Sequence, residues 1–129
     1  MDIEVLKTLT FGFPQSQWDA AKLEAREQLI VVAKRAGTIA YGDLAAKIKS
    51  ISFGANDDPF HKMLGQISVA EEAARRGMLS VLVVHRGGDM RPGPGLFELA
   101  QQLGRDTKDR EKFWIDEFNV VLKAWSKSA

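Results

Sequence analysis

Hydrophobic positions along the chain recur mainly at three- and four-residue steps, which is the spacing of amphipathic helices. The clearest case lies in 16–36, where charged side chains occupy the opposite face. We expect one helix of about 20 residues here, begun by a capping box of Ser16 and Asp19 and ended at Gly37. Its apolar face consists of Trp18, Ala21, Ala25, Leu29, Val32, Ala33 and Ala36.

Two further helices are expected in the middle of the chain. A short one carries Leu44, Ala45 and Ile48 on its apolar side. After a polar loop over 49–58, anchored by Phe53, a third helix begins with Asp58 as its cap and Pro59 at its first position. Its inward side chains are Phe60, Met63, Leu64 and Ile67, and its outward ones are His61, Lys62 and Gln66.

The remaining helices are predicted from their boundary residues. Ser68 and Glu71 form a second capping box, which predicts a fresh helix over 69–76. Another helix runs from Gly95 to a stop at Gly104, and a last one covers about 109–126. The aromatic residues of this last helix are expected in the core, with a partner surface as the alternative, and are Trp114, Phe118 and Trp125.

Two segments are typical of strands. Residues 2–11 alternate between apolar and polar positions, which favours a strand, although Leu6 also permits a short helix. The run 79–84 is short, apolar and rich in β-branched residues, so it predicts a buried strand. A turn over 86–89 and a returning edge strand at 90–91, limited by Pro92, would complete a hairpin.

This order of elements predicts a mainly α fold with a small β-hairpin. A single domain over 1–129 would contain a winged helix-turn-helix-like core at about 37–103, with flanking helices at about 16–36 and 109–126. In such a core the third helix can enter a major groove while the wing touches the DNA backbone. The residues expected to share one core are Leu44, Ile48, Leu64, Ile67, Leu82 and Phe97.

Composition narrows the possible chemistry. The 129 residues include no cysteine, which excludes a disulfide, a cysteine zinc site and a cysteine nucleophile. The first fifteen residues lack a basic segment typical of a secretory signal, and no apolar run approaches the ~20 residues that span a bilayer. We therefore expect a cytoplasmic protein with no membrane partner.

Because the positive and negative charges of the chain nearly cancel, a nucleic-acid-binding surface would need its cations gathered in one place. Eighteen Lys and Arg against seventeen Asp and Glu give a net charge of +1. Seven cations would form a phosphate-binding patch if the second and third helices and the wing share a face. They are Lys47, Lys49, Lys62, Arg75, Arg76, Arg86 and Arg91. The alternative is that Arg75 and Arg76 only complement a helix terminus and that the others are solvated.

One stretch resembles a known family. Residues 37–45, Gly-Thr-Ile-Ala-Tyr-Gly-Asp-Leu-Ala, are similar to the Gly-x-Val-x-Thr-Tyr-Gly-x-x-Ala motif of alkylguanine-DNA alkyltransferases and alkyltransferase-like proteins. Residues 62–65 look like that family's Arg-Ala-Val-Gly, and 83–86 fall where it has Pro-Cys-His-Arg. The resemblance covers roughly 37–103 and implies a DNA-binding domain in which Tyr41 contacts a phosphate or packs half-buried.

The departures from the family pattern remove its reaction. Val84 stands at the alkyl-accepting cysteine, so alkyl transfer to this protein is excluded and no covalent label is expected from alkylated guanine. Lys62 stands where the family has the arginine that inserts into the base stack. Lysine lacks the planar guanidinium, so the resemblance gives base extrusion no support.

The sequence leaves two functions open. The first is a non-catalytic nucleic-acid-binding protein that contacts a duplex, most simply DNA, through the third helix and the wing. Its binding residues would be Tyr41, Lys47, Lys62, Arg75, Arg76, His85, Arg86 and Arg91. The second is a small protein-interaction module, such as an antitoxin or a toxin-immunity protein. His61 and His85 lack a ligand spacing, so no catalytic residue, metal or cofactor is expected.

Overall fold

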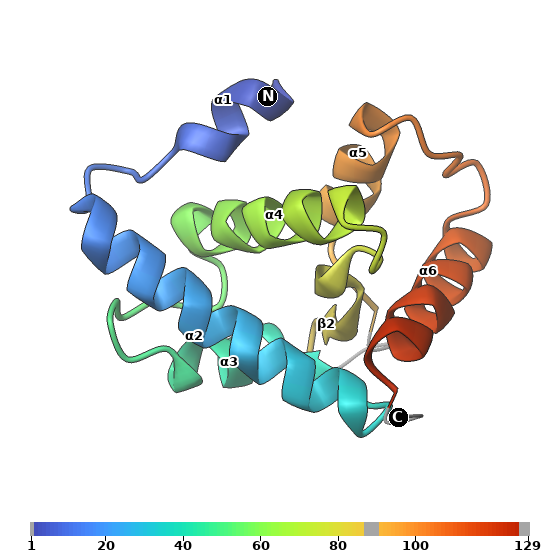
Figure 1. Ribbon diagram of the computed structural model, residues 1–129, viewed down its shortest axis with the longest axis horizontal. Helices are drawn as coiled ribbons and strands as arrows, with labels where there is room; N and C mark the ends of the chain where they lie inside the picture. Colours follow the sequence, from blue (N-terminus) through green and yellow to red (C-terminus); the bar gives the residue numbers. More distant parts are fainter. Residues whose placement is uncertain (1, 87–90, 127–129) are drawn as a thin grey trace.

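The computed structural model describes residues 2–86 and 91–126, and within these ranges the protein is mainly helical (Figure 1). The helices and strands, in chain order, are α1 (Ile3–Thr8), α2 (Gln15–Lys34), β1 (Ile39–Ala40), α3 (Tyr41–Lys47), α4 (Asp58–Ala73), the 3-10 helix η1 (Leu79–Leu82), β2 (Val83–Val84), α5 (Pro94–Gln102) and α6 (Arg110–Trp125). In the described residues no helix is long and apolar enough to cross a membrane.

Helix α4 occupies the centre of the molecule. It packs against α1, α2, α5 and η1, while α6 packs against α2 and η1 (Figure 1). Trp18 and Leu29 of α2 are buried in the same core as Phe60 and Met63 of α4. The core predicted from the sequence is confirmed, because one cluster contains Leu44, Ile48, Leu64, Ile67, Leu82 and Phe97.

Helix α2 confirms the predicted long helix but not its caps. Its N-cap is Pro14, with no side-chain cap bond, so the capping box of Ser16 and Asp19 is wrong. At the other end Ala36 takes the left-handed conformation, with φ +56°, that we expected of Gly37. The Gly37 N–H bonds the Val32 carbonyl at 3.1 Å and the Ala36 N–H bonds Ala33 at 3.0 Å. These two bonds form a Schellman motif one residue earlier than predicted.

The strand favoured over 2–11 is wrong, and the short helix that Leu6 left open as the alternative is observed as α1. Asp2 caps this helix by accepting the Glu4 N–H at 3.4 Å. The buried amide of Gln66 donates to the carbonyls of Leu6 and Leu9, each at 2.8 Å, at the other end. Gln66 was expected on the outer side of its helix. It is buried instead because these carbonyls satisfy its amide nitrogen.

A single helix, α4, runs through the predicted break at 69. The helix begins at Asp58 with Asp57 as its N-cap, one residue before the expected cap. The second capping box is wrong, because Ser68 hydrogen-bonds the Ser80 hydroxyl at 2.6 Å and accepts the Ser80 N–H at 2.9 Å. Since these partners lie on η1, the Ser68 side chain stabilises tertiary packing instead of a helix start.

The buried apolar run 79–84 is only partly a strand. Its first four residues form η1, and Val83 and Val84 pair in parallel with Ile39 and Ala40. Among the described residues, this two-stranded parallel sheet is the only sheet, and it was not expected from the sequence. The predicted hairpin turn over 86–89 and the returning strand at 90–91 fall largely outside the described residues, although the His85 N–H bonds the Arg91 carbonyl at 2.9 Å.

The other expected helices are confirmed. The short helix around Leu44 is α3, and the helix ended by Gly104 is α5, where Gly104 has φ +83°. The last helix is α6, whose N-cap Asp109 accepts the Lys112 N–H at 3.0 Å.

We predict that Leu64→Ala lowers the free energy of unfolding by about 2–5 kcal/mol, because it leaves a cavity at a core position. The Leu64 side chain is 3% exposed, whereas Leu23, on the solvent side of α2, is 53% exposed. Leu23→Ala is therefore the matched control, with an expected change within about 0.5 kcal/mol. Urea unfolding curves measure both, and equal stability of the two variants would contradict this placement of α4.

Candidate nucleic-acid interface

The candidate site begins where the two short strands end. Because β1 and β2 are parallel with Ala40 opposite Val84, the residues that follow them leave the sheet side by side. The rings of Tyr41 and His85 accordingly lie 4.8 Å apart between centroids, inclined at 39°. The pairing thus brings together two site residues that the sequence predicted separately.

A third ring, from His61, completes a stack around Tyr41. Its centroid lies 4.7 Å from that of Tyr41, with 13° between the planes. His61 lies in the first turn of α4, and its Nε2 is 2.7 Å from the Ala55 carbonyl. A carbonyl oxygen only accepts, so Nε2 carries the hydrogen. His61 was not among the predicted binding residues, because helical spacing places it outward and gives no sign of a ring partner on α3.

The Tyr41 hydroxyl is fixed from the segment before α5. It accepts the Gly93 N–H at 3.1 Å, and burial raises the pKa of Tyr41 above its ordinary value. Gly93 approaches so closely that an added Cβ would lie 3.0 Å from His85 Nε2 and 3.4 Å from the Tyr41 hydroxyl. Tyr41 is therefore packed inside the protein, which is one of the two alternatives expected for it, the other being contact with a phosphate.

A cavity of about 330 Å³ opens beside this stack. Among its lining residues are Tyr41, His61, Lys62, His85 and Glu98. Lys62 is held by an ion pair with Asp58 at 2.9 Å. The cavity is at the small end of the range for ligand pockets and combines aromatic faces with a few polar groups.

A larger open groove, of about 870 Å³, is lined in part by the two residues of β1. The end of α2, β1 and α3 form it, and Arg86 reaches it from the end of β2. Its described lining contains four cationic side chains against one carboxylate, Asp43, which pairs with Arg86. The four cations are Arg35, Lys47, Lys49 and Arg86. Of these, Arg35 was absent from the predicted patch, because that patch was limited to the second and third helices and the wing, whereas Arg35 caps the end of α2.

The eight predicted residues therefore fall into separate groups. Tyr41, Lys62 and His85 line the cavity, and Lys47 and Arg86 line the groove. Arg91 contacts Glu111 at 3.4 Å.

Arg75 and Arg76 follow the opposite end of α4 from Lys62. A helix of 16 residues is roughly 24 Å long. The Arg75 backbone is left-handed, with φ +63°, and Arg76 binds the carboxylate of Glu71. Both charges therefore lie at the C-terminus of α4, in agreement with the alternative that Arg75 and Arg76 complement a helix terminus.

In the part of the chain that the structure describes, no three His, Asp or Glu side chains are grouped so that they could hold a metal ion. Comparison of the chain with family models, with curated proteins and with solved structures gives no match. The alkyltransferase-like resemblance thus rests on residues 37–45, 62–65 and 83–86 alone.

We predict that Tyr41 ionises at higher pH in the folded protein than the usual value of about 10. Burial of the phenol raises its pKa, and Tyr41 is the one tyrosine of the chain, so phenolate absorbance reports it alone. Its contribution to stability is full below the unfolded-state pKa and is lost as pH rises through the folded-state pKa. Titration in buffer and in denaturant compares the two states. A folded-state midpoint at or below the denatured one would contradict the burial of this hydroxyl.

Proposed function

We propose that the protein is a non-catalytic, winged-helix-type nucleic-acid-binding protein whose groove follows the phosphate backbone of a duplex. The observation that carries the proposal is the groove, where Arg35, Lys47, Lys49 and Arg86 face one opening. A chain of net charge +1 has no general attraction for nucleic acid, so cations gathered in a groove are what phosphate binding requires.

The single carboxylate of the groove is compatible with this function. Arg86 and Asp43 form an ion pair whose side chains are 71% and 53% exposed. Exposed ion pairs contribute only about 0–1 kcal/mol, so a phosphate can replace Asp43 as the partner of Arg86 at little cost. Arg86 would then bind the phosphate while Lys47 and Lys49 neutralise its neighbours.

The winged-helix part of the proposal rests on the order of elements and on the resemblance of residues 37–45. In this arrangement α3 and α4 are the helix-turn-helix pair, and the segment after β2 is the wing. Lys62, two residues after Phe60 at the start of α4, would be the cation nearest the major groove. Its ion pair with Asp58 and the neighbouring Asp57 limit how closely phosphates approach there.

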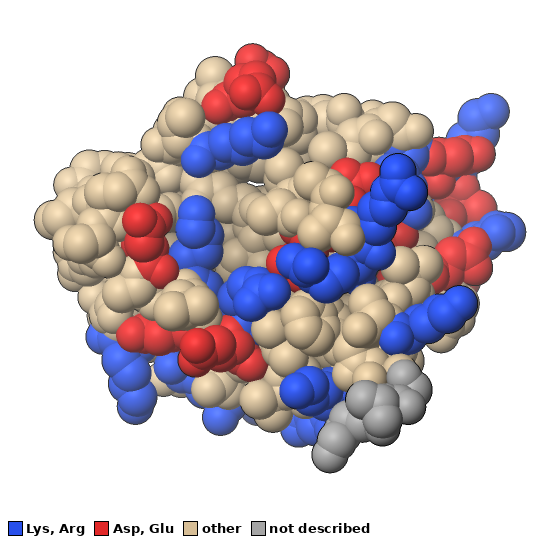
Figure 2. Space-filling view, viewed as in Figure 1, with Lys and Arg blue, Asp and Glu red and all other residues tan. Residues whose placement is uncertain are grey.

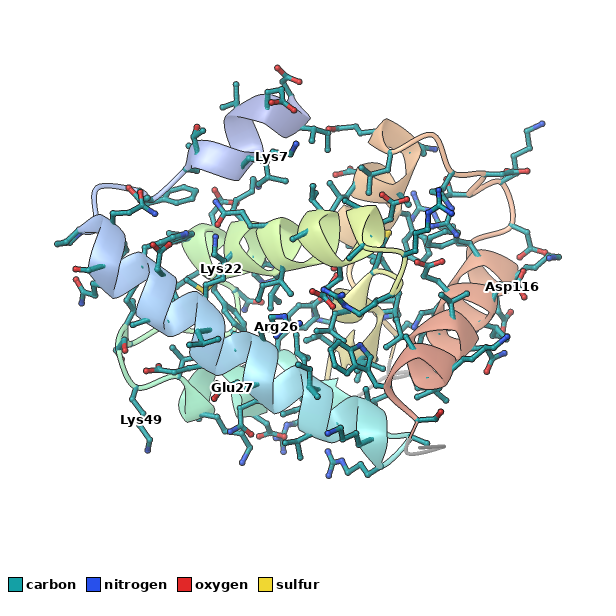
Figure 3. The ribbon with its side chains drawn as sticks, viewed as in Figure 1. Lys7, Lys22, Arg26, Glu27, Lys49 and Asp116 are labelled. Carbon is teal, nitrogen blue, oxygen red and sulfur yellow. The ribbon has the colours of Figure 1, made fainter. Side chains whose placement is uncertain are left out.

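We predict weak duplex binding that falls steeply with salt, with a log–log slope of about −0.9 for each phosphate neutralised. Arg86→Ala and Lys47→Ala should each make the slope shallower by roughly one, because each removes one phosphate contact. Fluorescence anisotropy of a labelled mixed-sequence duplex, titrated with salt, measures the slopes. The control is Lys7→Ala on α1, which removes the same charge on the other side of the molecule from Lys49 (Figure 3).

The same titration separates the possible surfaces. If Lys62→Ala causes the largest loss of duplex affinity, α4 enters the major groove of the DNA. If Arg86→Ala and Lys47→Ala cause the largest losses, the cationic groove of the protein binds the duplex. Equal losses for Lys7→Ala and Arg86→Ala would show a general charge effect and contradict a defined surface. An unchanged anisotropy at ~50 mM salt, where phosphate contacts are strongest, would overturn the proposal in favour of a protein partner.

A further inference from the structure

A second cationic surface lies on the face shown in Figure 2. There a row of Lys and Arg side chains crosses the middle of the molecule. Lys22 and Arg26, one turn apart on α2, belong to it, whereas Lys49 of the groove lies at the edge of the same view (Figure 3). This surface and the groove are therefore distinct.

The centre of this surface is a cluster of Arg26, Glu71, Arg76 and Trp125, here called the Arg–Trp cluster. Both guanidinium groups lie over the Trp125 ring, at 5.5 Å for Arg26 and 5.7 Å for Arg76 from its centroid. Both also donate to the Glu71 carboxylate, Arg26 through Nε at 3.2 Å and Arg76 through Nε at 2.8 Å and Nη2 at 3.0 Å. The cluster thus joins α2, α4 and α6 around one carboxylate.

The cluster carries an excess of positive charge. Burial alone would raise the pKa of Glu71, but the hydrogen bonds from Arg76 and Arg26 outweigh burial and lower it, so this carboxylate is ionised at neutral pH. Two guanidinium groups share its single negative charge. The ammonium group of the adjacent Lys22 contacts the uncharged Gln66 amide oxygen at 3.1 Å.

These cations are accessible and have apolar neighbours. The side chains of Arg26 and Arg76 are 33% and 40% exposed, so their remaining N–H groups can reach a ligand. Val120 of α6 is exposed beside Gly77, which follows Arg76. On α2 the exposed Leu23 lies in the row next to Lys22 and Arg26, a row that also contains the exposed Glu27. A ligand on this face would meet positive charge and aliphatic surface together.

We propose that the Arg–Trp cluster docks an acidic, amphipathic segment of a partner protein. Arginine binds carboxylates through two parallel hydrogen bonds, and because Glu71 uses the Nε side of both guanidinium groups, their outer Nη edges remain for a partner carboxylate. Trp and Arg are also enriched among the residues that dominate protein interfaces. The aliphatic neighbours match the apolar positions of such a segment. A nucleic-acid strand fits less well, because the guanidinium groups cover the ring face on which a base would stack.

The indole N–H signals of the three tryptophans provide the test. The Trp125 Nε1 is buried without a hydrogen-bond partner among the described residues, whereas the Trp114 Nε1 bonds the Val81 carbonyl at 2.9 Å. The probe is a synthetic helical peptide of Glu, Leu and Ala, added to ¹⁵N-labelled protein. We expect the Trp125 signal to shift with saturation while that of Trp114 stays in place.

Variants then assign the binding to the cluster. Arg76→Ala should weaken the peptide about tenfold, as expected for one charge-assisted hydrogen-bonding partner. Arg76→Ala also removes one ion-pair partner of Glu71. Lys22→Ala therefore provides a second test, because Lys22 contacts the uncharged Gln66 amide and not a carboxylate. We expect it to weaken binding about threefold, because it removes one nearby positive charge. Lys49→Ala, in the groove, is the matched control and should leave the peptide affinity unchanged.

Three outcomes would overturn the proposal: no shift of Trp125, an equal shift with a peptide that has Lys in place of Glu, or a shift with duplex DNA but not with the acidic peptide. An equal loss for Lys49→Ala and Lys22→Ala would also overturn it, since the attraction would then be general. Because the peptide and the duplex are assayed separately, failure of this proposal leaves the groove proposal standing, and the reverse also holds.

Discussion

The candidate interface depends on a parallel pairing only two residues long. Ile39 opposite Val83 and Ala40 opposite Val84 join segments far apart in the sequence. Tyr41 leaves this pair beside His85, and Asp43 and Arg86, one or two residues further along their segments, form an ion pair. All four strand residues are buried, so packing in the core supports the pair in addition to its backbone hydrogen bonds. A slip of one residue would separate the ring stack and the cationic groove together.

Buried polar side chains tie the outer helices to this centre. Gln66 accepts from Trp18 and Lys22 and donates to the carbonyls of Leu6 and Leu9, so all four of its hydrogen-bonding positions are used inside the protein. Glu117 of α6 accepts the Met78 N–H at 2.8 Å and an Arg105 guanidinium N–H at 2.6 Å. Removing one partner from such a group leaves the other unsatisfied, which costs more than the bond itself contributes. These contacts therefore specify how α1 sits on α4 and how α6 sits against the segment that leads into η1.

Helical periodicity was sufficient to predict α2, α3, α5 and α6 and the shared core, because each element buries a clear apolar face. It failed where polar residues find distant partners. The side chains of Ser68 and Glu71 have the spacing of a capping box, yet they bind Ser80 and two arginines inside the fold. The alternation in 2–11 was misleading because Asp2 and Gln66 hydrogen-bond the free backbone groups at the two ends of α1, which allows a short helix to form there. Of the site, Tyr41, Lys47, His85 and Arg86 were predicted, whereas the contributions of His61 and Arg35 depend on tertiary contacts that local patterns do not contain.

Amide hydrogen exchange with and without a DNA duplex tests most directly whether the groove receives the phosphates. Exchange slows where a ligand covers or stabilises local structure, so it locates the bound surface without any substitution. We predict slower exchange within 38–49 and at Arg86, with the effect decreasing as salt rises, and no change around Trp125. Slowing confined to the face of α2 and α4, or no slowing at low salt, would contradict nucleic-acid binding by the groove.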